Sequence, residues 1–479
     1  MSAYDIVVLG AGTGGYSAAL RSAGLGLATC LVERDLVGGT CLHRGCIPTK
    51  AMLHAAELAD GVREGRERWG IQATLEGIDV PKVLHARDDV VERNFRGLET
   101  HLAGAGVTIV RGEGRLTGPR TVVVGGDQEL TAGRAVVLAT GSVPTVLPGL
   151  ALDGQRILTS DEALRLDRVP RSAVVLGAGS VGVEFASLWC SFGSEVTVVE
   201  ALPSVLPLED PDVGRELARA LRQRGLAIRV DTRFESVETT RDGVRVTVSH
   251  GEATEVLEAE LLLLAVGRSP VTADLGYEAA GVKLDRGYVV PKDWATLETD
   301  VPGVFAVGDI LPPPSLALAH ASFAEGMLVA ELVAGLRPPP IDYDGVPRAT
   351  YSSPEAASVG LTEPVARDRG LEVVTNRMPF GGVAKGLIFG QGGFVKVVAE
   401  KDGQVLGVHM VGARVTELIS EAMLITNWEA DPGDVAQLIH PHPTLSEAIG
   451  EAHLTLAGRP LHQAVPGSRR AAAAPAGTR

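Results

Sequence analysis

A six-residue segment that occurs twice constrains the fold of this chain more than any other feature. The sequence VVLGAG stands at residues 7–12 and again at residues 174–179. In each copy an apolar strand pattern leads into a glycine-rich turn and a helical pattern, and a second apolar stretch ends in Glu33 or Glu200. The interval from the first glycine to the glutamate is the same in both copies. Two βαβ units with one internal register predict two separate nucleotide-binding domains.

Both copies match the pattern G-x-G-x-x-G, in which each glycine has a task. The first permits a tight turn, the second lets the backbone approach a diphosphate at a helix N-terminus, and the third allows close packing of helix on strand. The glutamates are expected to accept hydrogen bonds from ribose hydroxyls; a solvated strand-end residue would explain either one singly, but not the matched pair. Because Glu200 would repel a 2′-phosphate, the second site is expected to prefer NAD over NADP.

Composition excludes several classes of function. A length of 479 residues suggests about three domains, and 45% apolar with 22% charged residues is typical of a globular protein. The formal net charge of −15 disfavours both nucleic acid and anionic membrane surfaces as partners. No signal peptide is evident, and apolar stretches such as residues 261–266 are far shorter than the roughly 18 residues of a membrane span. We therefore expect a cytoplasmic protein.

Two of the four cysteines, Cys41 and Cys46, lie in the segment GGTCLHRGCIPTK at residues 38–50. In a regular helix, a rise of about 1.5 Å per residue would place their Cα atoms too far apart for a disulfide. We therefore expect a bend, which Gly45 permits, and a helix that begins just beyond Cys46. A helix N-terminus lowers the pKa of a thiol and favours the thiolate. The pair is predicted to be redox-active in a reducing cytoplasm.

A zinc site is the main alternative for this pair, but the sequence has no second ligand cluster with suitable spacing, so we expect no metal. Two unrelated buried cysteines would not explain the glycine-rich flanks. The other two cysteines, Cys30 and Cys190, are expected to be small buried hydrophobes.

With these motifs the chain resembles the pyridine nucleotide–disulfide oxidoreductases over residues 4–458, and most closely their dihydrolipoamide-oxidising branch. The segment 407–419 favours that branch. His43 and Arg44 depart from the Asn-Val pair that is common between the family's cysteines. The other matching segments are residues 39–50, 299–309, 318–326, 351–363 and 440–447.

The resemblance implies that the first fingerprint holds FAD and the second holds NAD. It implies that Asp309 binds the flavin ribityl chain, that Cys46 lies against the isoalloxazine, and that Cys41 exchanges with substrate sulfur. Lys50 and Glu184 match an ion pair beside the flavin. The residues assigned to FAD are Gly10, Gly12, Gly15, Glu33, Thr140, Gly141, Asp309 and Ala317, and those assigned to NAD are Gly177, Gly179, Gly182, Glu200 and Gly267.

A histidine and a glutamate near the C-terminus, His442 and Glu447, complete the expected catalytic set. A glutamate five residues after a histidine, across a helix start, can hold the imidazole in one tautomer. Alone, such a pair is usually structural. The resemblance implies that the partner subunit supplies it as the acid–base group of thiol exchange, so that a homodimer shares its active sites. His440 lacks the spacing to Glu447.

The resemblance further implies oxidation of dihydrolipoamide to lipoamide with reduction of NAD⁺. The expected partner is the lipoyl-bearing acyltransferase of a 2-oxo acid dehydrogenase complex, or a glycine cleavage system, present as a separate chain. One alternative is a reductase of glutathione, mycothiol or a related disulfide; most of these use NADPH, which Glu200 disfavours. The other is a flavin-binding scaffold subunit, against which the intact cysteine and histidine set argues.

The predicted fold class is α/β, with two Rossmann-like dinucleotide-binding domains and a C-terminal α+β dimerisation domain. In that last domain, antiparallel strands are expected near residues 394–398 and 405–411 and helices near 413–428 and 444–456. The expected domains are FAD-binding (1–145), NAD-binding (146–268), central and completing the FAD site (269–340), dimerisation (341–465), and a disordered tail (466–479).

Overall fold

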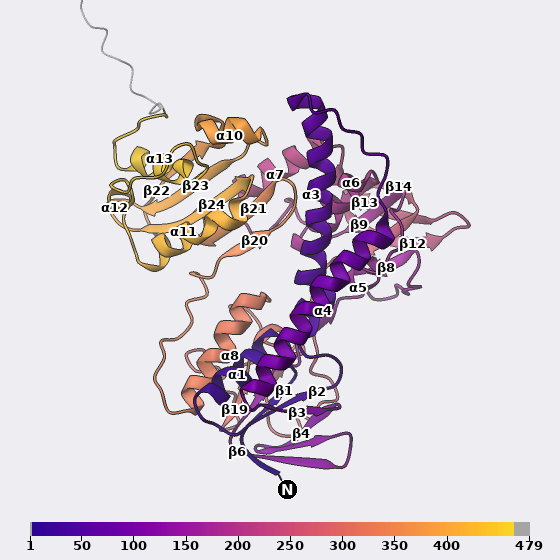
Figure 1. The fold of residues 1–479 in the computed structure, drawn as a ribbon, viewed down its shortest axis with the longest axis vertical. Helices are drawn as coiled ribbons and strands as arrows, with labels where there is room; N and C mark the ends of the chain where they lie inside the picture. Colours follow the sequence, from indigo (N-terminus) through magenta and orange to yellow (C-terminus); the bar gives the residue numbers. More distant parts are fainter. Residues whose placement is uncertain (1, 464–479) are drawn as a thin grey trace, which may run out of the picture. The chain divides into compact units, whose positions relative to one another are not determined.

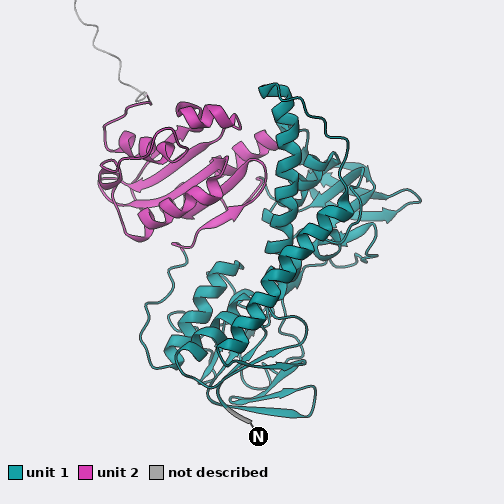
Figure 2. Ribbon diagram, in the orientation of Figure 1, with its two compact units in different colours: residues 1–203, 222–343 teal, residues 204–221, 344–479 magenta. Residues whose placement is uncertain are grey.

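The computed structural model describes residues 2–463, and its contacts divide the chain into two compact units. Unit 1 is Met1–Pro203 with Arg222–Tyr343, and unit 2 is Ser204–Leu221 with Asp344–Arg479 (Figure 2). The predicted tail at residues 466–479 lies outside the described residues. Within residues 2–463, no helix combines the length and apolar character that crossing a membrane requires.

The first sheet of unit 1 has seven strands in the order β3-β2-β1-β6-β5-β4, with β19 also paired to β6. The pairs β1–β2, β1–β6, β2–β3 and β6–β19 are parallel, whereas β4–β5 and β5–β6 are antiparallel. The strands are β1 (Ser2–Leu9), β2 (Thr29–Glu33), β3 (Thr108–Arg111), β4 (Gly114–Gly118), β5 (Thr121–Val124), β6 (Gln128–Leu138) and β19 (Val304–Ala306). The continuous apolar run at residues 6–9 is fully buried, as in parallel sheets covered on both faces.

Helices α1 (Thr13–Gly24) and α8 (Ala319–Val333) lie side by side on this half of unit 1 (Figure 1). Gly326 makes the close approach possible, because a Cβ atom there would lie 2.3 Å from the carbonyl oxygen of Gly14. The helix that follows the first glycine turn is therefore fixed by a segment distant in sequence.

The second βαβ unit forms a five-stranded parallel sheet in the order β11-β10-β9-β15-β8. Its strands are β8 (Ile157–Thr159), β9 (Ser172–Leu176), β10 (Glu195–Val199), β11 (Ala227–Arg229) and β15 (Leu261–Leu264), and its helices are α5 (Ser160–Ala163) and α6 (Ser180–Phe192). Between β11 and β15 the chain forms a separate antiparallel sheet of three strands. These are β12 (Arg233–Thr239), β13 (Val244–His250) and β14 (Ala253–Ala259).

Short elements connect the two halves of unit 1. β7 (Ser142–Pro144) pairs antiparallel with β16 (Arg268–Pro270), so the segments that leave β6 and β15 run beside each other. The remaining short elements are β17 (Leu284–Asp285), β18 (Tyr288–Val289) and the 3-10 helix η1 (Gly308–Ile310).

The cysteine segment forms two helices, as the expected bend at Gly45 requires. α2 (Gly39–Arg44) ends at Gly45, whose φ of −142° and ψ of −112° interrupt the helix, and α3 (Cys46–Trp69) begins directly after it. α3 packs against α6 and against the 25-residue helix α4 (Val80–Gly104). The sequence predicts the start of α3 just beyond Cys46, but it does not predict α4 or the packing of the two long helices against each other.

Unit 2 is built on an antiparallel sheet in the order β20-β21-β24-β23-β22, as the alternating patterns indicate. The strands are β20 (Arg348–Thr350), β21 (Glu355–Gly360), β22 (Val373–Pro379), β23 (Phe394–Glu400) and β24 (Val405–Gly412). α11 (Val415–Asn427) and α13 (Glu447–Leu456) pack on it, and the other helices are α7 (Pro211–Gln223), α9 (Glu363–Asp368), η2 (Phe380–Gly382), α10 (Ala384–Phe389) and α12 (Pro432–Val435).

A buried ion cluster fixes the segment before α7 within unit 2. The ammonium of Lys396, on β23, lies 3.0 Å from Asp210, 2.7 Å from Asp212 and 2.8 Å from Glu363. The Lys396 side chain is only 5% exposed and Asp210 is fully buried. This explains why the segment Ser204–Leu221, which lies inside the predicted NAD-binding domain in sequence, groups with unit 2. The predicted domain boundaries remain a prediction.

Candidate active site

Both glycine turns have the geometry that the fingerprint requires. Gly10 and Gly177 have φ angles of +99° and +100°. A Cβ atom on Gly10 would lie 2.3 Å from the carbonyl oxygen of Ala139, just after β6, and one on Gly177 would lie 2.3 Å from that of Ala265, just after β15. A Cβ atom on Gly15 or Gly182 would lie 1.8 or 2.0 Å from the oxygen of the first glycine. These four positions therefore exclude any side chain.

The middle glycines, Gly12 and Gly179, differ from their neighbours. A Cβ atom on either would meet no atom within 4 Å, and each residue is the N-cap of the following helix, α1 or α6. Open space in front of unpaired helix N–H groups is what an approaching diphosphate needs. Both turns therefore fit a dinucleotide.

The two strand-end glutamates make the same hydrogen bonds in both copies. Glu33 accepts from the N–H groups of Ala11 (2.7 Å) and Asp35 (2.8 Å). Glu200 accepts from the N–H groups of Ala178 (2.7 Å) and Leu202 (2.8 Å). Neither is a solvated strand-end residue, because each carboxylate is held against its glycine turn, where the ribose of a bound dinucleotide would lie.

A cavity in unit 1 joins the first glycine turn to the predicted FAD residues. Thr140 donates a hydrogen bond to the carbonyl of Val271 (2.6 Å), and Asp309, on η1, accepts one from Ser142 (2.5 Å). Gly141 has a φ of +70°. The cavity is lined by Gly10, Gly12, Glu33, Arg34, Asp35, Leu36, Gly39, Thr40, His43, Arg44, Ala139, Thr140, Gly141, Ser142, Val143, Pro144, Asp161, Arg268 and Val271.

Of the residues predicted to bind FAD, Gly15, Asp309 and Ala317 lie outside this lining, as do the residues predicted to bind NAD, Gly267 among them. Ala317 is exposed in the loop before α8, and Gly267 precedes β16 with a φ of +126°. Their assignments to FAD and NAD stay predictions.

Cys41 and Cys46 are brought together by the helix break. Cys41 lies on α2 and Cys46 is the first residue of α3, both are unbonded thiols, and their side chains are hydrogen-bonded. The hydrogen bond from Cys41 lowers the pKa of Cys46 to about 7 against the opposing effect of burial, and the charge of Lys50 lowers it further. The same hydrogen bond, together with burial, raises the pKa of Cys41. Cys46 is therefore the thiolate of the pair.

Lys50 and Glu184 form the expected ion pair. The Lys50 ammonium, one turn after Cys46 on α3, lies 2.9 and 2.8 Å from the two carboxylate oxygens of Glu184 on α6. The Glu184 side chain is 5% exposed. This pair joins the cysteine helix to the helix of the second glycine turn.

His442 and Glu447 lie in unit 2 and make the expected contact. The imidazole Nδ1 of His442 lies 2.8 Å from Glu447, and the imidazole is 71% exposed. Although burial opposes it, hydrogen bonds from the Thr444 N–H and from His442 hold the pKa of Glu447 below its usual range. Glu447 can therefore fix the tautomer of an accessible base. His440 pairs instead with Glu421, at 2.7 Å.

Sequence reasoning missed several residues at this site. Arg268 donates to the Ser142 hydroxyl and carbonyl, both at 2.7 Å, and so supports the residue that holds Asp309. Asp161, on α5, lines the cavity at the first glycine turn with a buried oxygen that has no hydrogen-bond partner among the described residues. Tyr16, on α1, has its pKa raised to about 12 by burial and by Cys41 and Cys46. Only the Gly267-Arg268 pair at a strand end offered a sequence signal.

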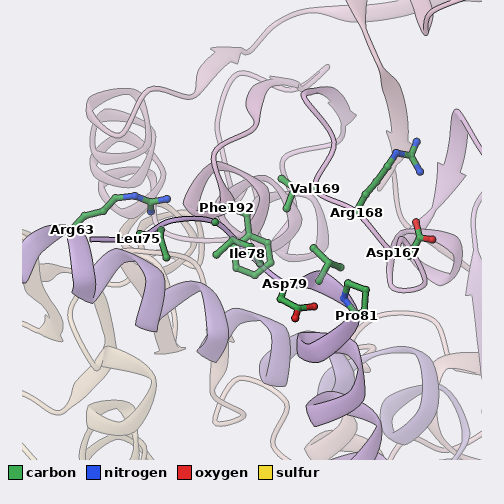
Figure 3. A pocket seen from close by; sticks show the side chains of 11 residues that line it. Arg63, Leu75, Ile78, Asp79, Pro81, Asp167, Arg168, Val169 and Phe192 are labelled. Atoms are coloured by element: carbon green, nitrogen blue, oxygen red, sulfur yellow. The ribbon is translucent and has the colours of Figure 1, made fainter. Parts of the chain in front are cut away.

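A second cavity in unit 1, of about 510 Å³, contains none of the predicted site residues. It lies among the end of α3, the loop before α4 and the segment 167–169 (Figure 3). Arg63 and Arg168 border it together with apolar side chains such as Ile78 and Phe192.

Two dinucleotide-binding turns and a thiol pair of unequal acidity within one unit define a class, the flavin-linked dithiol oxidoreductases. Comparison with known proteins places the chain more narrowly. Residues 4–326 match the pyridine nucleotide-disulphide oxidoreductase family, and residues 346–453 match its dimerisation domain. The chain belongs to this family.

Curated relatives match over nearly the whole length. A dihydrolipoyl dehydrogenase of Bacillus subtilis is 39% identical over 96% of this chain and 99% of its own, and one of Thermus scotoductus is 40% identical over the same shares. Among solved structures, LpdA from Mycobacterium tuberculosis superimposes with a TM-score of 0.86 at 27% identity, covering 95% of this chain and all of its own.

These matches confirm the predicted family, the α/β fold class with its dimerisation domain, and the enzyme class, a flavoprotein disulfide oxidoreductase. The family uses FAD and NAD, as predicted. The similarity to dihydrolipoyl dehydrogenases supports the predicted activity, and the dimerisation domain supports a homodimer.

Proposed function

We propose that this chain oxidises protein-bound dihydrolipoamide to lipoamide, with NAD⁺ as the electron acceptor, through a disulfide between Cys41 and Cys46. One observation carries the proposal: a thiol with a lowered pKa at the first residue of α3 is hydrogen-bonded to a second thiol, in the unit that holds both dinucleotide turns. Full-length similarity to dihydrolipoyl dehydrogenases supports the choice of substrate.

Cys41 is assigned to exchange with substrate. A substrate thiolate attacks the Cys41 sulfur of the oxidised pair, a mixed disulfide forms, and Cys46 leaves as thiolate. The lower pKa of Cys46 makes it the better leaving group. The second substrate thiol, once deprotonated, attacks its own disulfide-bound sulfur, which releases lipoamide and returns Cys41 as a thiol.

Lys50 and Glu184 are assigned to stabilise the reduced pair. The Lys50 charge favours the Cys46 thiolate, while buried Glu184 holds the ammonium in place. Bound FAD supplies a two-electron carrier between the cysteine pair and NAD⁺. In sum, the dithiol loses two electrons and two protons, NAD⁺ gains a hydride, and one proton is released.

His442 is assigned as the acid–base group, positioned by Glu447. Its Nε2 atom takes the proton of the second substrate thiol, while Nδ1 stays bound to Glu447. The imidazole is exposed within its own unit, as a group that serves a site formed in a dimer must be. We propose that each active site uses His442 of the partner subunit.

The remaining assignments follow from the two glycine turns. The first turn, with Glu33 and Asp309, is assigned to FAD, and the second, with Glu200, to NAD rather than NADP. The FAD-binding, NAD-binding, central and dimerisation domains are proposed with the boundaries given above. Protein-bound lipoamide requires a lipoyl-bearing partner, for which an acyltransferase of a 2-oxo acid dehydrogenase complex or a glycine cleavage system is proposed.

Steady-state rates with matched substrates test this function. We expect turnover of lipoamide with NADH to exceed turnover with NADPH, and to exceed turnover of glutathione disulfide with either nucleotide, by at least about 100-fold, a difference that pocket hydrogen bonds and charge readily produce. Preferential reduction of glutathione disulfide with NADPH would contradict the proposal.

A further inference from the structure

Glu325 is a buried carboxylate that the proposed mechanism leaves without a task. It lies in the middle of α8, in the segment 318–326 that matches the family, and its side chain is fully buried. A buried carboxylate is costly unless hydrogen bonds compensate it. The groups that compensate it therefore indicate what it does.

Three segments of unit 1 donate hydrogen bonds to Glu325. The backbone N–H of Gly308 donates to Oε2 at 2.6 Å. The hydroxyl groups of Ser315 and Tyr343 donate to Oε1 at 2.7 and 2.9 Å. One side chain thus ties together η1, the loop before α8, and the end of unit 1.

The shortest of these contacts, from the Gly308 N–H at 2.6 Å, lies directly beside the proposed flavin ligand. Gly308 precedes Asp309 in η1, and its φ of +76° requires a glycine-like backbone. The Ser142 hydroxyl donates to the Asp309 carboxylate at 2.5 Å, and Glu325 accepts from the backbone N–H of the preceding residue, Gly308, in the same turn. The Asp309 side chain is therefore aimed by two independent contacts.

The next residue links the same helix to the first glycine turn. Gly326 packs against Gly14 and Ser17 of α1, where a Cβ atom would lie 2.3 and 2.2 Å away. Residues 325 and 326 therefore tie one helix both to the Asp309 turn and to the helix of the first glycine turn, the two features assigned above to FAD.

We propose that Glu325 is a positioning residue for FAD, which holds the turn at Gly308 so that Asp309 faces the flavin ribityl chain. The inference rests on the proposed role of Asp309. Glu325 itself touches no cofactor; it acts through the Gly308 N–H.

The test is the rate of FAD release from the full-length holoenzyme, followed by flavin fluorescence, for Glu325→Ala, Glu325→Gln, Asp309→Asn and the double variant Glu325→Ala/Asp309→Asn. Loss of the acceptor for the Gly308 N–H should speed release by about 10- to 100-fold in Glu325→Ala, because a buried donor left unpaired is costly. Glu325→Gln keeps an oxygen acceptor and should fall between wild type and Glu325→Ala. Because Glu325 acts through Asp309, the double variant should release FAD no faster than Asp309→Asn alone.

The matched control is Glu331→Gln on the same helix. Glu331 lies six residues after Glu325 and makes a partly exposed ion pair with Arg21 of α1, at 2.6 Å. Its FAD release should stay within twofold of wild type. Equal acceleration in this control would show that loosening α8 in general is sufficient, and would overturn the inference.

The outcomes separate the inference from the proposed function. If Asp309→Asn accelerates release but Glu325→Ala does not, or if the two effects multiply, the positioning role is wrong. If Asp309→Asn has no effect, the assignment of Asp309 to FAD fails, and the positioning role fails with it. Should Glu325→Ala not fold, Tyr343→Phe and Ser315→Ala each remove one donor to Oε1; faster release in both supports the inference, and unchanged release in both contradicts it.

Discussion

Cys46 differs from an ordinary cysteine because several groups act on its sulfur. The Cys41 thiol donates a hydrogen bond to it, Lys50 supplies a positive charge, and the N-terminus of α3 adds its dipole. These effects outweigh burial, which alone would favour the neutral thiol. Because of this difference, Cys46 leaves as the thiolate when substrate attacks Cys41. In the reduced pair Cys41, whose pKa is the higher of the two, keeps its proton.

The acidity of Cys46 gives a pH prediction. With a pKa lowered to about 7, the reduced pair should hold a thiolate above neutral pH and lose it as the pH falls through that value. We expect the long-wavelength thiolate-to-flavin absorption of the reduced holoenzyme to titrate with a midpoint near 7. Lys50→Met should move the midpoint upward, because the positive charge is lost. A wild-type midpoint near 9, the value of an ordinary thiol, would contradict this.

Replacement of His442 tests the proposed base. His442→Gln should slow disulfide exchange with lipoamide by about 10²–10⁴-fold, the usual contribution of a positioned base. FAD should stay bound, because His442 lies in unit 2, away from the cysteine and FAD residues in sequence and outside their unit. His440→Gln is the control: it removes the contact with Glu421 and should leave exchange within a few-fold of wild type. Comparable losses in both variants would remove His442 from the mechanism.

At the scale of elements, the two glycine turns give a matched pair of variants. Gly10→Ala and Gly177→Ala would each place a Cβ atom 2.3 Å from a carbonyl oxygen, at a φ near +100° that other residues rarely adopt. Gly10→Ala should lower the FAD content of the purified protein, measured by absorbance. Gly177→Ala should retain FAD and raise the KM for NADH by about tenfold or more. Loss of FAD from Gly177→Ala alone would reverse the assignment of the turns.

The same elements show how far sequence reasoning reaches. The paired turns were predictable because their glycines, strands and glutamates stand close together in sequence and follow one register. The break between α2 and α3 was predictable from Gly45 and the disulfide distance limit. The contacts of Glu325 and Arg268 were not predictable, because their partners Gly308 and Ser142 are brought to them only by packing of distant segments.

At the scale of the molecule, the ion cluster around Lys396 should contribute strongly to the stability of unit 2. Lys396→Met would leave the fully buried carboxylate of Asp210 without its counter-charge, which typically costs about 3–5 kcal/mol. Thermal unfolding should show a clear drop in Tm. The control is Lys401→Met, which removes an exposed ion pair with Glu372 and should cost no more than about 1 kcal/mol. Similar Tm values for the two variants would contradict the role given to the buried cluster.

The shared active site predicts complementation between two inactive variants. Cys41→Ser and His442→Gln homodimers should each be nearly inactive. After their subunits are mixed by reversible dissociation, about half of the dimers should be hybrids with one complete site, so about one quarter of wild-type activity should return. No recovery despite hybrid formation would show that His442 acts within its own subunit, or not at all.

The most direct test of the whole account is an anaerobic titration of the holoenzyme with dihydrolipoamide, followed by visible absorption. The wild-type protein should take up one dithiol per subunit with the appearance of the long-wavelength band, and NAD⁺ should then discharge it. The Cys41→Ser and Cys46→Ser proteins should not be reduced by the dithiol, although both keep FAD. Dithiol oxidation at an undiminished rate in either serine variant would contradict the claim that electrons pass through this cysteine pair.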